Sequence, residues 1–404
     1  MSASNWSRVK LKYLAALKSG DAIDGKDIKD EGDYPVYGGN GLRGYTDRFT
    51  HEGERVLIGR QGALCGNINY AKGKFWATEH AIVATPKQGF NVTWLGEALR
   101  AMNLNQYTQS AAQPGIAVEV IENLELLVPP RATQDQIANQ LSARLAQVDG
   151  LVQAKQHLLK LLNEKRRVLI ANAVTRGLNP DAPMRDSGID WLGDLPSHWS
   201  LPPLRRVITS LDQGWSPVAS NLPAEEGERA VLKLSAVKAG HFLPQENKAL
   251  LSVGDIPQNL DIKSGDVFLT RANTSSLVGD AAMAEKDCPN LVFSDLIYRL
   301  RVSAALIDPR WLVYVLISDT GRQQVEAEAK GSSGSMVKLA QDQVLGLVIP
   351  VPPLVEQVEI IGEVSHGTRK LDKLIDATRA TVDLLVERRA SLVAEAIAGE
   401  GVTS

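Results

Sequence analysis

A glycine-rich polar stretch, GGNGLRGY at residues 38–45, has the residue types of a nucleic-acid contact. Arginine donates hydrogen bonds mainly to guanine edges and asparagine to adenine edges, while glycine lets the backbone approach a ligand closely. A tight hairpin turn without a ligand would show the same pattern, so both interpretations are open. The candidate contacts are Gly39, Asn40, Gly41, Arg43 and Tyr45.

Two arginines occupy equivalent places further along the chain. Arg60 follows the apolar segment VLIG and Arg271 follows VFLT, and the polar loops QGALCGN and ANTSSLVGD come next. Each arginine would bind a phosphate or a base, or else form a structural ion pair with Glu79 or Asp295. We favour the nucleic-acid contact, and we add Asn273 from the second loop.

Two further segments carry candidate donors. Lys74 in KGKF is either a phosphate contact or a solvated side chain. The segment DQGWSPVAS contributes Gln213 and Ser216, and we expect it to occupy the second half of the chain as GGNG occupies the first. Trp215 in the same segment is typical of a core residue.

No motif predicts an enzyme. Residues 39–44 satisfy the G-x-G-x-x-G spacing, but no apolar helix follows them, as a dinucleotide-binding loop requires. The chain contains neither an N-P-P-[FY] tetrapeptide nor a G-x-x-x-x-G-K-[ST] loop. Asp319, Glu328 and Lys330 loosely follow the pattern of a metal-dependent nuclease, but the segment predicts one exposed helix without the flanking strands. We therefore expect no catalytic residue and no metal ligand.

Length and composition indicate a soluble protein of two or three units. The chain has 404 residues, 44% of them hydrophobic and 23% charged, and contains no apolar run of membrane-spanning length. We expect a cytoplasmic protein with no membrane partner. The net charge of −3 means that nucleic-acid binding must depend on local patches. Cys65 and Cys288 suit neither a disulfide framework nor zinc, so we expect both to be buried.

One passage of the sequence occurs twice. VPPRATQDQIANQL begins at residue 128 and VPPLVEQVEIIGEV at residue 351, and an offset of 223 positions holds without a gap as far as Ala173 and Ala396. Polar identities such as Gln134 with Gln357 are retained as well as the apolar phase. The preceding segments share a plan too, so the chain reads as domain, long helix, connector, domain, long helix.

Both copies predict a long helix with one apolar seam, because apolar residues alternate at steps of four and three. Arg166 and Arg389 interrupt the seam at equivalent positions. Each either extends out to solvent or forms a polar layer that fixes register. The predicted seam residues are Leu141, Leu145, Val148, Val152, Lys155, Leu159, Leu162, Arg166, Leu169 and Ala173, then Val364, Thr368, Leu371, Ile375, Thr378, Val382, Leu385, Arg389, Leu392 and Ala396.

The layout resembles the specificity subunit of type I restriction-modification systems over essentially the whole chain. The residues that carry the resemblance are LVPPRATQDQ, IPVPPLVEQ, DSGIDWLGDLPSHW, YPVYGGNGLRGY and VLIGRQGALCGN. The resemblance implies an α+β fold with two similar α/β target recognition domains separated by two long antiparallel coiled-coil helices, related by an internal pseudo-two-fold repeat. The expected parts are recognition domains at 1–130 and 200–353, spacer helices at 131–177 and 354–399, and a connector at 178–199.

The same resemblance implies a non-catalytic subunit that directs others to double-stranded DNA, each domain recognising half of a split, asymmetric sequence. The implied partners are two methyltransferase (modification) subunits and restriction subunits, which would hold S-adenosylmethionine, ATP and Mg²⁺, while this chain holds no cofactor. It also places two polar loops near DNA, and their candidate contacts are Gln113, Lys330, Ser332 and Ser335.

Independently of the resemblance, two related domains on a stiff helical spacer suit two short recognition elements at a fixed distance, with centres about 10 bp apart. The alternative of another class is a coiled-coil adaptor that binds proteins. A steep fall of DNA affinity with rising salt would distinguish the two.

Overall fold

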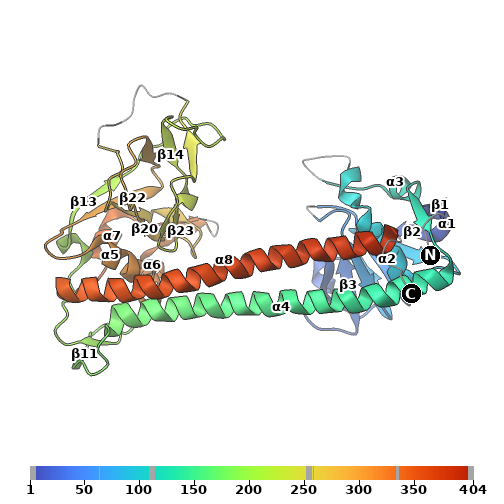
Figure 1. The fold of residues 1–404 in the computed structure, drawn as a ribbon, viewed down its shortest axis with the longest axis horizontal. Helices are drawn as coiled ribbons and strands as arrows, with labels where there is room; N and C mark the ends of the chain where they lie inside the picture. Colours follow the sequence, from blue (N-terminus) through green and yellow to red (C-terminus); the bar gives the residue numbers. More distant parts are fainter. Residues whose placement is uncertain are drawn as a thin grey trace. The chain divides into compact units, whose positions relative to one another are not determined.

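The computed structural model describes residues 6–62, 64–108, 114–251, 257, 259–333 and 336–398. The chain divides into two units: unit 1 comprises residues 1–158 with 378–404, and unit 2 comprises residues 159–377. Two long helices, α4 (Arg131–Arg176) and α8 (Leu354–Ala398), each contribute to both units (Figure 1). Within the described ranges, no helix has the length and apolar character needed to cross a membrane.

Unit 1 contains two four-stranded sheets. The first has the strand order β2-β9-β6-β7, and all neighbours are antiparallel. The second has the order β4-β3-β8-β5, in which β3 and β8 are parallel. The strands are β2 (Ala15–Ser19), β3 (Tyr34–Gly38), β4 (Gly41–Thr46), β5 (His51–Glu52), β6 (Arg55–Gly59), β7 (Ile68–Ala71), β8 (Lys74–Ala77) and β9 (Ala81–Pro86).

Helix α2 (Val92–Ala101) covers the first sheet of unit 1. Asn91 caps it, since the side-chain oxygen accepts a hydrogen bond from the Trp94 amide at 2.9 Å. Trp94, Leu95 and Ala98 are almost fully buried in the core that includes β6 and β9. The remaining elements of the unit are β1 (Ser7–Lys10), α1 (Leu11–Leu14), η2 (Gly25–Asp27), η3 (Leu104–Tyr107), α3 (Val118–Glu122) and β10 (Glu125–Val128).

Unit 2 repeats this topology. Its four-stranded sheet has the order β13-β22-β18-β20, again antiparallel throughout, and a second sheet has the order β17-β14-β21 with β14 and β21 parallel. The predicted α+β class and internal repeat are therefore confirmed. The strands are β13 (Ile208–Gln213), β14 (Ala230–Leu232), β17 (Asn247–Ala249), β18 (Val267–Thr270), β20 (Ala281–Met283), β21 (Leu291–Phe293) and β22 (Ile297–Val302).

Helix α5 (Pro309–Ile317) of unit 2 corresponds to α2, with Trp311 in the place of Trp94. Asp308 caps α5 by accepting a hydrogen bond from the Arg310 amide at 2.8 Å. The other elements of the unit are β11 (Met184–Asp186), β12 (Asp194–Pro196), η4 (Leu204–Arg206), η5 (Leu234–Ala236), β15 (Val237–Lys238), β16 (His241–Phe242), β19 (Ala272–Asn273), α6 (Asp319–Glu328), β23 (Lys330–Ser333), β24 (Met336–Lys338) and α7 (Gln341–Gly346).

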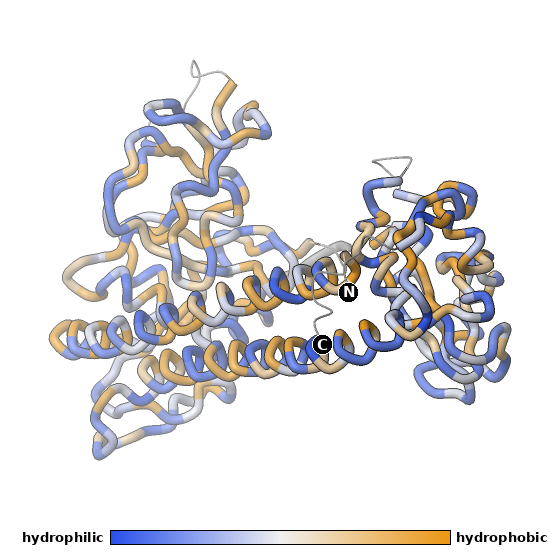
Figure 2. The backbone as a smooth tube through the Cα atoms, turned by 45° about the vertical axis from the view of Figure 1, so that its right-hand side comes forward, coloured by the Kyte–Doolittle hydropathy of each residue, from blue (hydrophilic) through white to orange (hydrophobic). Residues whose placement is uncertain are grey.

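The long helices pair antiparallel within each unit. In unit 1, Leu141, Leu145 and Val148 of α4 share one apolar cluster with Leu392 and Val393 of α8. In unit 2, the Ile170 to Val174 segment of α4 packs in a core with the Ile360 to Val364 segment of α8. All the predicted seam residues are buried or half-buried. Hydrophobic residues recur between hydrophilic ones along both helices, as the heptad pattern predicted (Figure 2).

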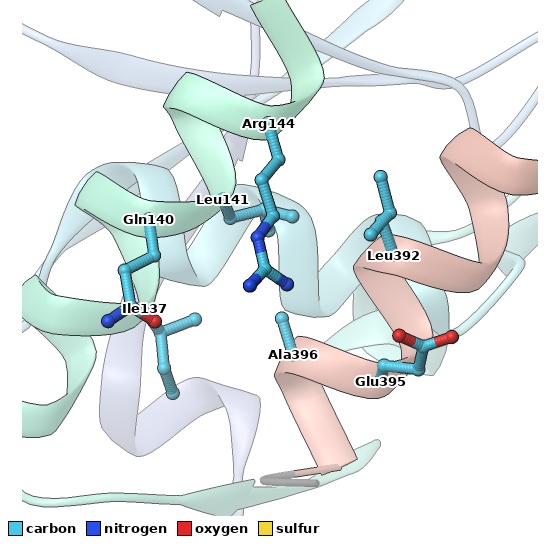
Figure 3. A pocket seen from close by; sticks show the side chains of 7 residues that line it. All are labelled: Ile137, Gln140, Leu141, Arg144, Leu392, Glu395 and Ala396. Atoms are coloured by element: carbon cyan, nitrogen blue, oxygen red, sulfur yellow. The ribbon is translucent and has the colours of Figure 1, made fainter. Parts of the chain in front are cut away.

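The helix pair is not equally tight along its length. In unit 1, Arg144 stands on α4 beside a small pocket between the helices, lined also by Ile137 and Ala396 (Figure 3). The position 223 residues later is Gly367, where a β-carbon would lie 3.2 Å from the side chain of Leu169. In unit 2 the glycine therefore lets Leu169 of α4 pack closely on α8. In unit 1 the equivalent residue is Arg144, which lines a small pocket.

A buried glutamine ties each long helix to its unit. Gln134 accepts a hydrogen bond from the Asn91 amide at 2.9 Å and donates one to the Pro129 carbonyl at 2.9 Å. Gln357 accepts one from the Asp308 amide at 2.8 Å and donates one to the Pro352 carbonyl at 2.8 Å. Both side chains are almost fully buried. These matched contacts give a physical reason for the glutamines to recur in the two copies.

The connector before the second domain is folded. Trp199 is buried against Trp311, with ring centroids 5.5 Å apart in an edge-to-face arrangement. Its Nε1 donates a hydrogen bond to Glu356 at the start of α8 at 3.1 Å. The two cysteines, Cys65 and Cys288, are buried as expected, and burial raises the pKa of both thiols.

Candidate nucleic-acid interface

Three loops of unit 1 meet at one end of its sheets and line a shallow hollow. The β3–β4 hairpin supplies Gly39, Asn40 and Arg43; the loop after β6 supplies Gln61 and Leu64; the turn before β9 supplies His80. Asn40, Arg43 and Gln61 are exposed. The fold thus brings part of the predicted GGNG cluster beside the loop that follows Arg60.

Glycines make this close meeting of loops possible. The hairpin pairs Tyr34 with Thr46 at one end and Gly38 with Gly41 at its tip, where Gly41 has a φ of +97°, a left-handed conformation that favours glycine. A β-carbon on Gly39 would lie 2.9 Å from the His80 carbonyl oxygen. The hairpin therefore packs its tip directly on the turn before β9.

A polar chain fixes the orientation of Gln61 in the hollow. The Nδ1 atom of His80 lies 3.0 Å from Oε1 of Gln61, and Nε2 of His80 lies 3.3 Å from the Glu79 carboxylate. With Oε1 directed at His80, the amide nitrogen of Gln61 remains to donate a hydrogen bond. Base acceptors such as guanine O6 or N7 suit that donor.

Arg60 and Arg271 occupy matching positions, as predicted. Arg60 donates to the backbone carbonyl of Glu79 at 3.5 Å, and Arg271 donates to that of Asp295 at 3.4 Å. Arg271 also donates to the Tyr298 hydroxyl at 3.0 Å. In the described part of the chain, neither arginine forms a salt bridge with the side chain of Glu79 or Asp295. The alternative of a structural ion pair with these two carboxylates is therefore wrong.

Two predicted contacts of unit 1 lie outside the hollow. Lys74 stands at the start of β8, with its Nζ 4.7 Å from the centre of the Phe49 ring. Tyr45 exchanges two backbone hydrogen bonds with Lys29, at 2.9 and 2.8 Å, on the far side of the hairpin from its tip. The distance of KGKF from the hairpin tip depends on strand pairing, which local sequence patterns do not encode.

The prediction that Gln213 and Ser216 occupy the place of GGNG is wrong. Gln213 is the last residue of β13, the counterpart of β2, and Gly214 therefore matches Gly20. A β-carbon on Gly20 would clash with the carbonyl of Ala77, as one on Gly214 would with that of Phe293, at 2.3 Å in both cases. The counterpart of the β3–β4 turn is instead the connection from β14 to β17.

The remaining candidates of unit 2 lie around β19. Asn273 is half-buried in β19, and its side-chain oxygen accepts a hydrogen bond from the Thr274 amide at 2.9 Å. β19 pairs with β24, which pairs with β23, the strand that contains Lys330 and Ser332. Gln113 and Ser335 lie outside the described residues.

Sequence analysis missed Gln61, Leu64 and His80 as members of this site. Gln61 stands next to Arg60 in a polar loop, which is a usable signal, since glutamine and arginine side chains both donate hydrogen bonds to base edges. His80 gave no local signal, because its position depends on the turn before β9 folding against the β3–β4 hairpin.

The two seam arginines form ion pairs between the long helices. Nε of Arg166 lies 2.9 Å from Oδ1 of Asp372 in unit 2, and Nε of Arg389 lies 2.9 Å from Oδ1 of Asp149 in unit 1. Each aspartate is the counterpart of the other at the 223-residue offset. The arginine of one copy therefore pairs with the aspartate of the other copy in both units.

The nuclease-like residues are engaged elsewhere. Asp319 pairs with Arg167 at 3.1 Å, and Glu328 ends helix α6. Among the described residues, no group of three or more histidine, cysteine or acidic side chains is placed to hold a metal ion.

Residues 3–160 match the family model described as the type I restriction modification DNA specificity domain. The EcoprrI specificity subunit from Escherichia coli is 45% identical over 135 residues, which cover 32% of this chain and 34% of that protein. The match to the EcoEI specificity subunit spans 39% of that relative, so the chain covers well under two thirds of these proteins.

Longer but weaker similarity extends over most of the chain. The MjaVIII specificity subunit from Methanocaldococcus jannaschii is 22% identical over 399 residues, covering 93% of this chain and 88% of that protein. A solved structure reported for the complex assembly and conformational transition of the type I R-M system aligns over 98% of both chains. Its TM-score is 0.64 at 16% identity, which shows a shared fold.

Proposed function

We propose that the chain is a specificity subunit of a type I restriction-modification system and that it selects the DNA sequence on which such a complex acts. The observation that carries the proposal is the duplicated topology: in the sheets β2-β9-β6-β7 and β13-β22-β18-β20, an arginine-containing polar loop follows the equivalent strands β6 and β18. Two similar but unequal loop clusters suit two different short half-sites.

The proposed parts follow the repeat. Residues 1–130 and 200–353 act as target recognition domains, residues 131–177 and 354–399 form the spacer, and residues 178–199 connect the halves. The length of the spacer helices sets the gap between half-sites, whose centres lie about one helical turn of DNA apart. Arg166 and Arg389 hold the register of the helices through their ion pairs.

Direct contacts to the first half-site come from the hollow of unit 1. Arg43, Gln61 and Asn40 present donors to base edges, and Arg60 precedes Gln61 in the chain. Gly39 and Gly41 allow the protein backbone to approach the DNA closely. In the second half-site, Arg271 and Asn273 take the equivalent place, beside the strand of Lys330 and Ser332.

The chain supplies no catalytic group in this proposal. Two methyltransferase subunits and restriction subunits bring S-adenosylmethionine, ATP and Mg²⁺, and the complex works in the cytoplasm on double-stranded DNA. Exposed apolar residues recur at the repeat offset on the outside of the helices, Leu151 with Leu374 and Leu161 with Leu384. A surface that occurs twice suits two copies of one partner, here the methyltransferase subunit.

Modified-base sequencing of host DNA, with the gene intact and deleted, tests the proposal. We expect deletion to remove methylation at one split, asymmetric motif, which also identifies both half-sites. If methylation is unchanged in cells that express the complete complex, the specificity role is wrong. Affinity purification of the chain then distinguishes the protein-adaptor alternative through its partners.

A further inference from the structure

A hollow of unit 2 lies where α5, the β15–β16 hairpin and the long helices meet, and none of its lining residues belongs to the polar loops described above. We call it the cationic hollow. Most of the hollow is lined by polar atoms and charged side chains, unlike the apolar seam beside it. Its charged and titratable lining residues are Arg166, His241, Glu285, Arg310, Arg369 and Asp372.

The charges of this lining do not cancel. Arg166 forms a salt bridge with Asp372 at 2.9 Å and also donates a hydrogen bond to the Ala239 carbonyl at 3.3 Å. The exposed Arg310 and Arg369 form no salt bridge with a described residue, although Nε of Arg369 donates to the Ser365 carbonyl at 3.0 Å. Glu285 is the one remaining carboxylate of the lining that can balance the charges of Arg310 and Arg369. The lining therefore has a net positive charge even with His241 neutral.

Unit 1 has a hollow at the equivalent place, and there the charges are satisfied. Thr93, one position before Trp94, replaces Arg310, and Ala146, at the 223-residue offset, replaces Arg369. Glu97 in that hollow binds Arg100 at 3.0 Å and the Tyr70 hydroxyl at 2.8 Å. The same architecture therefore forms in unit 1 without the two arginines.

We propose that the cationic hollow binds a phosphate group, with Arg310 and Arg369 as its ligands. A guanidinium matches phosphate oxygens through paired N–H groups and stays charged at any physiological pH. The hydroxyls of Tyr314 and Ser365 lie 2.8 Å apart in the same hollow. One hydroxyl donates to the other, which leaves one O–H to donate to a phosphate oxygen.

The phosphate belongs either to a small molecule or to the DNA backbone. The hollow uses none of the loops assigned above to base contacts, so the inference goes beyond the proposed function. Its first test needs no DNA and keeps its meaning if that function is wrong.

The first experiment titrates inorganic phosphate into the full chain, at constant ionic strength in chloride, by isothermal calorimetry. We expect saturable binding that weakens at least tenfold in Arg310→Gln and in Arg369→Gln. The matched control is Arg205→Gln, because Arg205 is an exposed arginine of unit 2 outside the hollow, and it should bind as the parent chain does. Equal losses in the control would overturn the site.

The second experiment measures the affinity of the complete complex for duplex DNA against salt. If the ligand is a backbone phosphate, Arg310→Gln lowers the slope of log affinity against log salt by about one. The methylated motif then stays the same. If the ligand is a small molecule, the slope is unchanged while phosphate binding is lost. Unaltered behaviour in both experiments would refute the proposal. Arg310→Lys, which keeps the charge, controls for misfolding and should retain part of the binding.

Discussion

Gln134 and Gln357 show how a single buried amide joins two elements. Each accepts a hydrogen bond from the residue that caps a domain helix and donates to the first proline of its Pro-Pro pair. An apolar replacement of similar size leaves a buried N–H and a buried carbonyl without partners. Such groups each cost about 1–3 kcal/mol.

We therefore predict that Gln357→Leu loosens the junction of α8 with its unit. The Asp308 amide and the first turn of α8 should exchange hydrogen about ten- to hundredfold faster, which corresponds to about 1–3 kcal/mol of local stability. Hydrogen exchange read by mass spectrometry measures this. Gln156→Ala, at an exposed position of α4, should leave exchange in that region unchanged. Equal protection in both variants would contradict the junction role.

Under the proposed function, Gln61 contacts one half-site only, because the corresponding position of unit 2 is Ala272. Gln61→Ala should relax one base position in the half of the motif that unit 1 recognises, and it should leave the other half unchanged. A mismatched base pair typically costs about 1–3 kcal/mol, so losing discrimination at this position should make methylated variants of the motif visible in modified-base sequencing. Relaxation in both halves would be inconsistent with this assignment.

Single residues also show which parts of the site could be predicted from the sequence. The equivalence of Gln134 with Gln357 and of Arg60 with Arg271 followed from spacing alone. Their partners did not, since the Glu79 and Asp295 contacts go to backbone carbonyls and carbonyl positions depend on the fold. His80 was missed for the same reason, and Gln213 was misplaced because the equivalent strands of the two units are recognised only from the strand order.

Among the elements, the long helices were the most predictable, because one apolar seam over many turns encodes both the helix and its buried face. The two arginines that interrupt the apolar seam each require a carboxylate partner on the other helix. Arg166 is only 14% exposed, and its carboxylate partner Asp372 is 28% exposed. A guanidinium left without that carboxylate in a partly buried site destabilises its surroundings.

Asp372→Ala should therefore speed hydrogen exchange around the middle of α8, and the paired exchange Arg166→Asp with Asp372→Arg should restore much of the protection. We expect a loss of about 1–2 kcal/mol for the single change, discounted for partial exposure. Asp383→Ala, at an exposed position of α8 in unit 1, is the control. If the single change has no effect, Arg166 has no part in holding register.

For the whole molecule, the decisive quantity is the length of the helices that both units share. One heptad inserted after His157 in α4 and another after Ala380 in α8 fall at equivalent positions of the repeat and keep the seam in phase. Seven residues add about 10 Å at about 1.5 Å each. The gap in the methylated motif should grow by about three base pairs, since base pairs are stacked about 3.4 Å apart. An unchanged gap would show that the helices do not set it.

The glutamine junctions have a consequence for how such a chain changes over time. Both domains contact their long helix through the same hydrogen bonds. A foreign domain that keeps the cap residue and the Pro-Pro-x-x-x-Gln segment therefore keeps the hydrogen bonds that attach it to its helix. Under the proposed function, a genome could then acquire a new recognition specificity by recombination of one cassette, leaving the other half, the spacer and the docking of partners untouched.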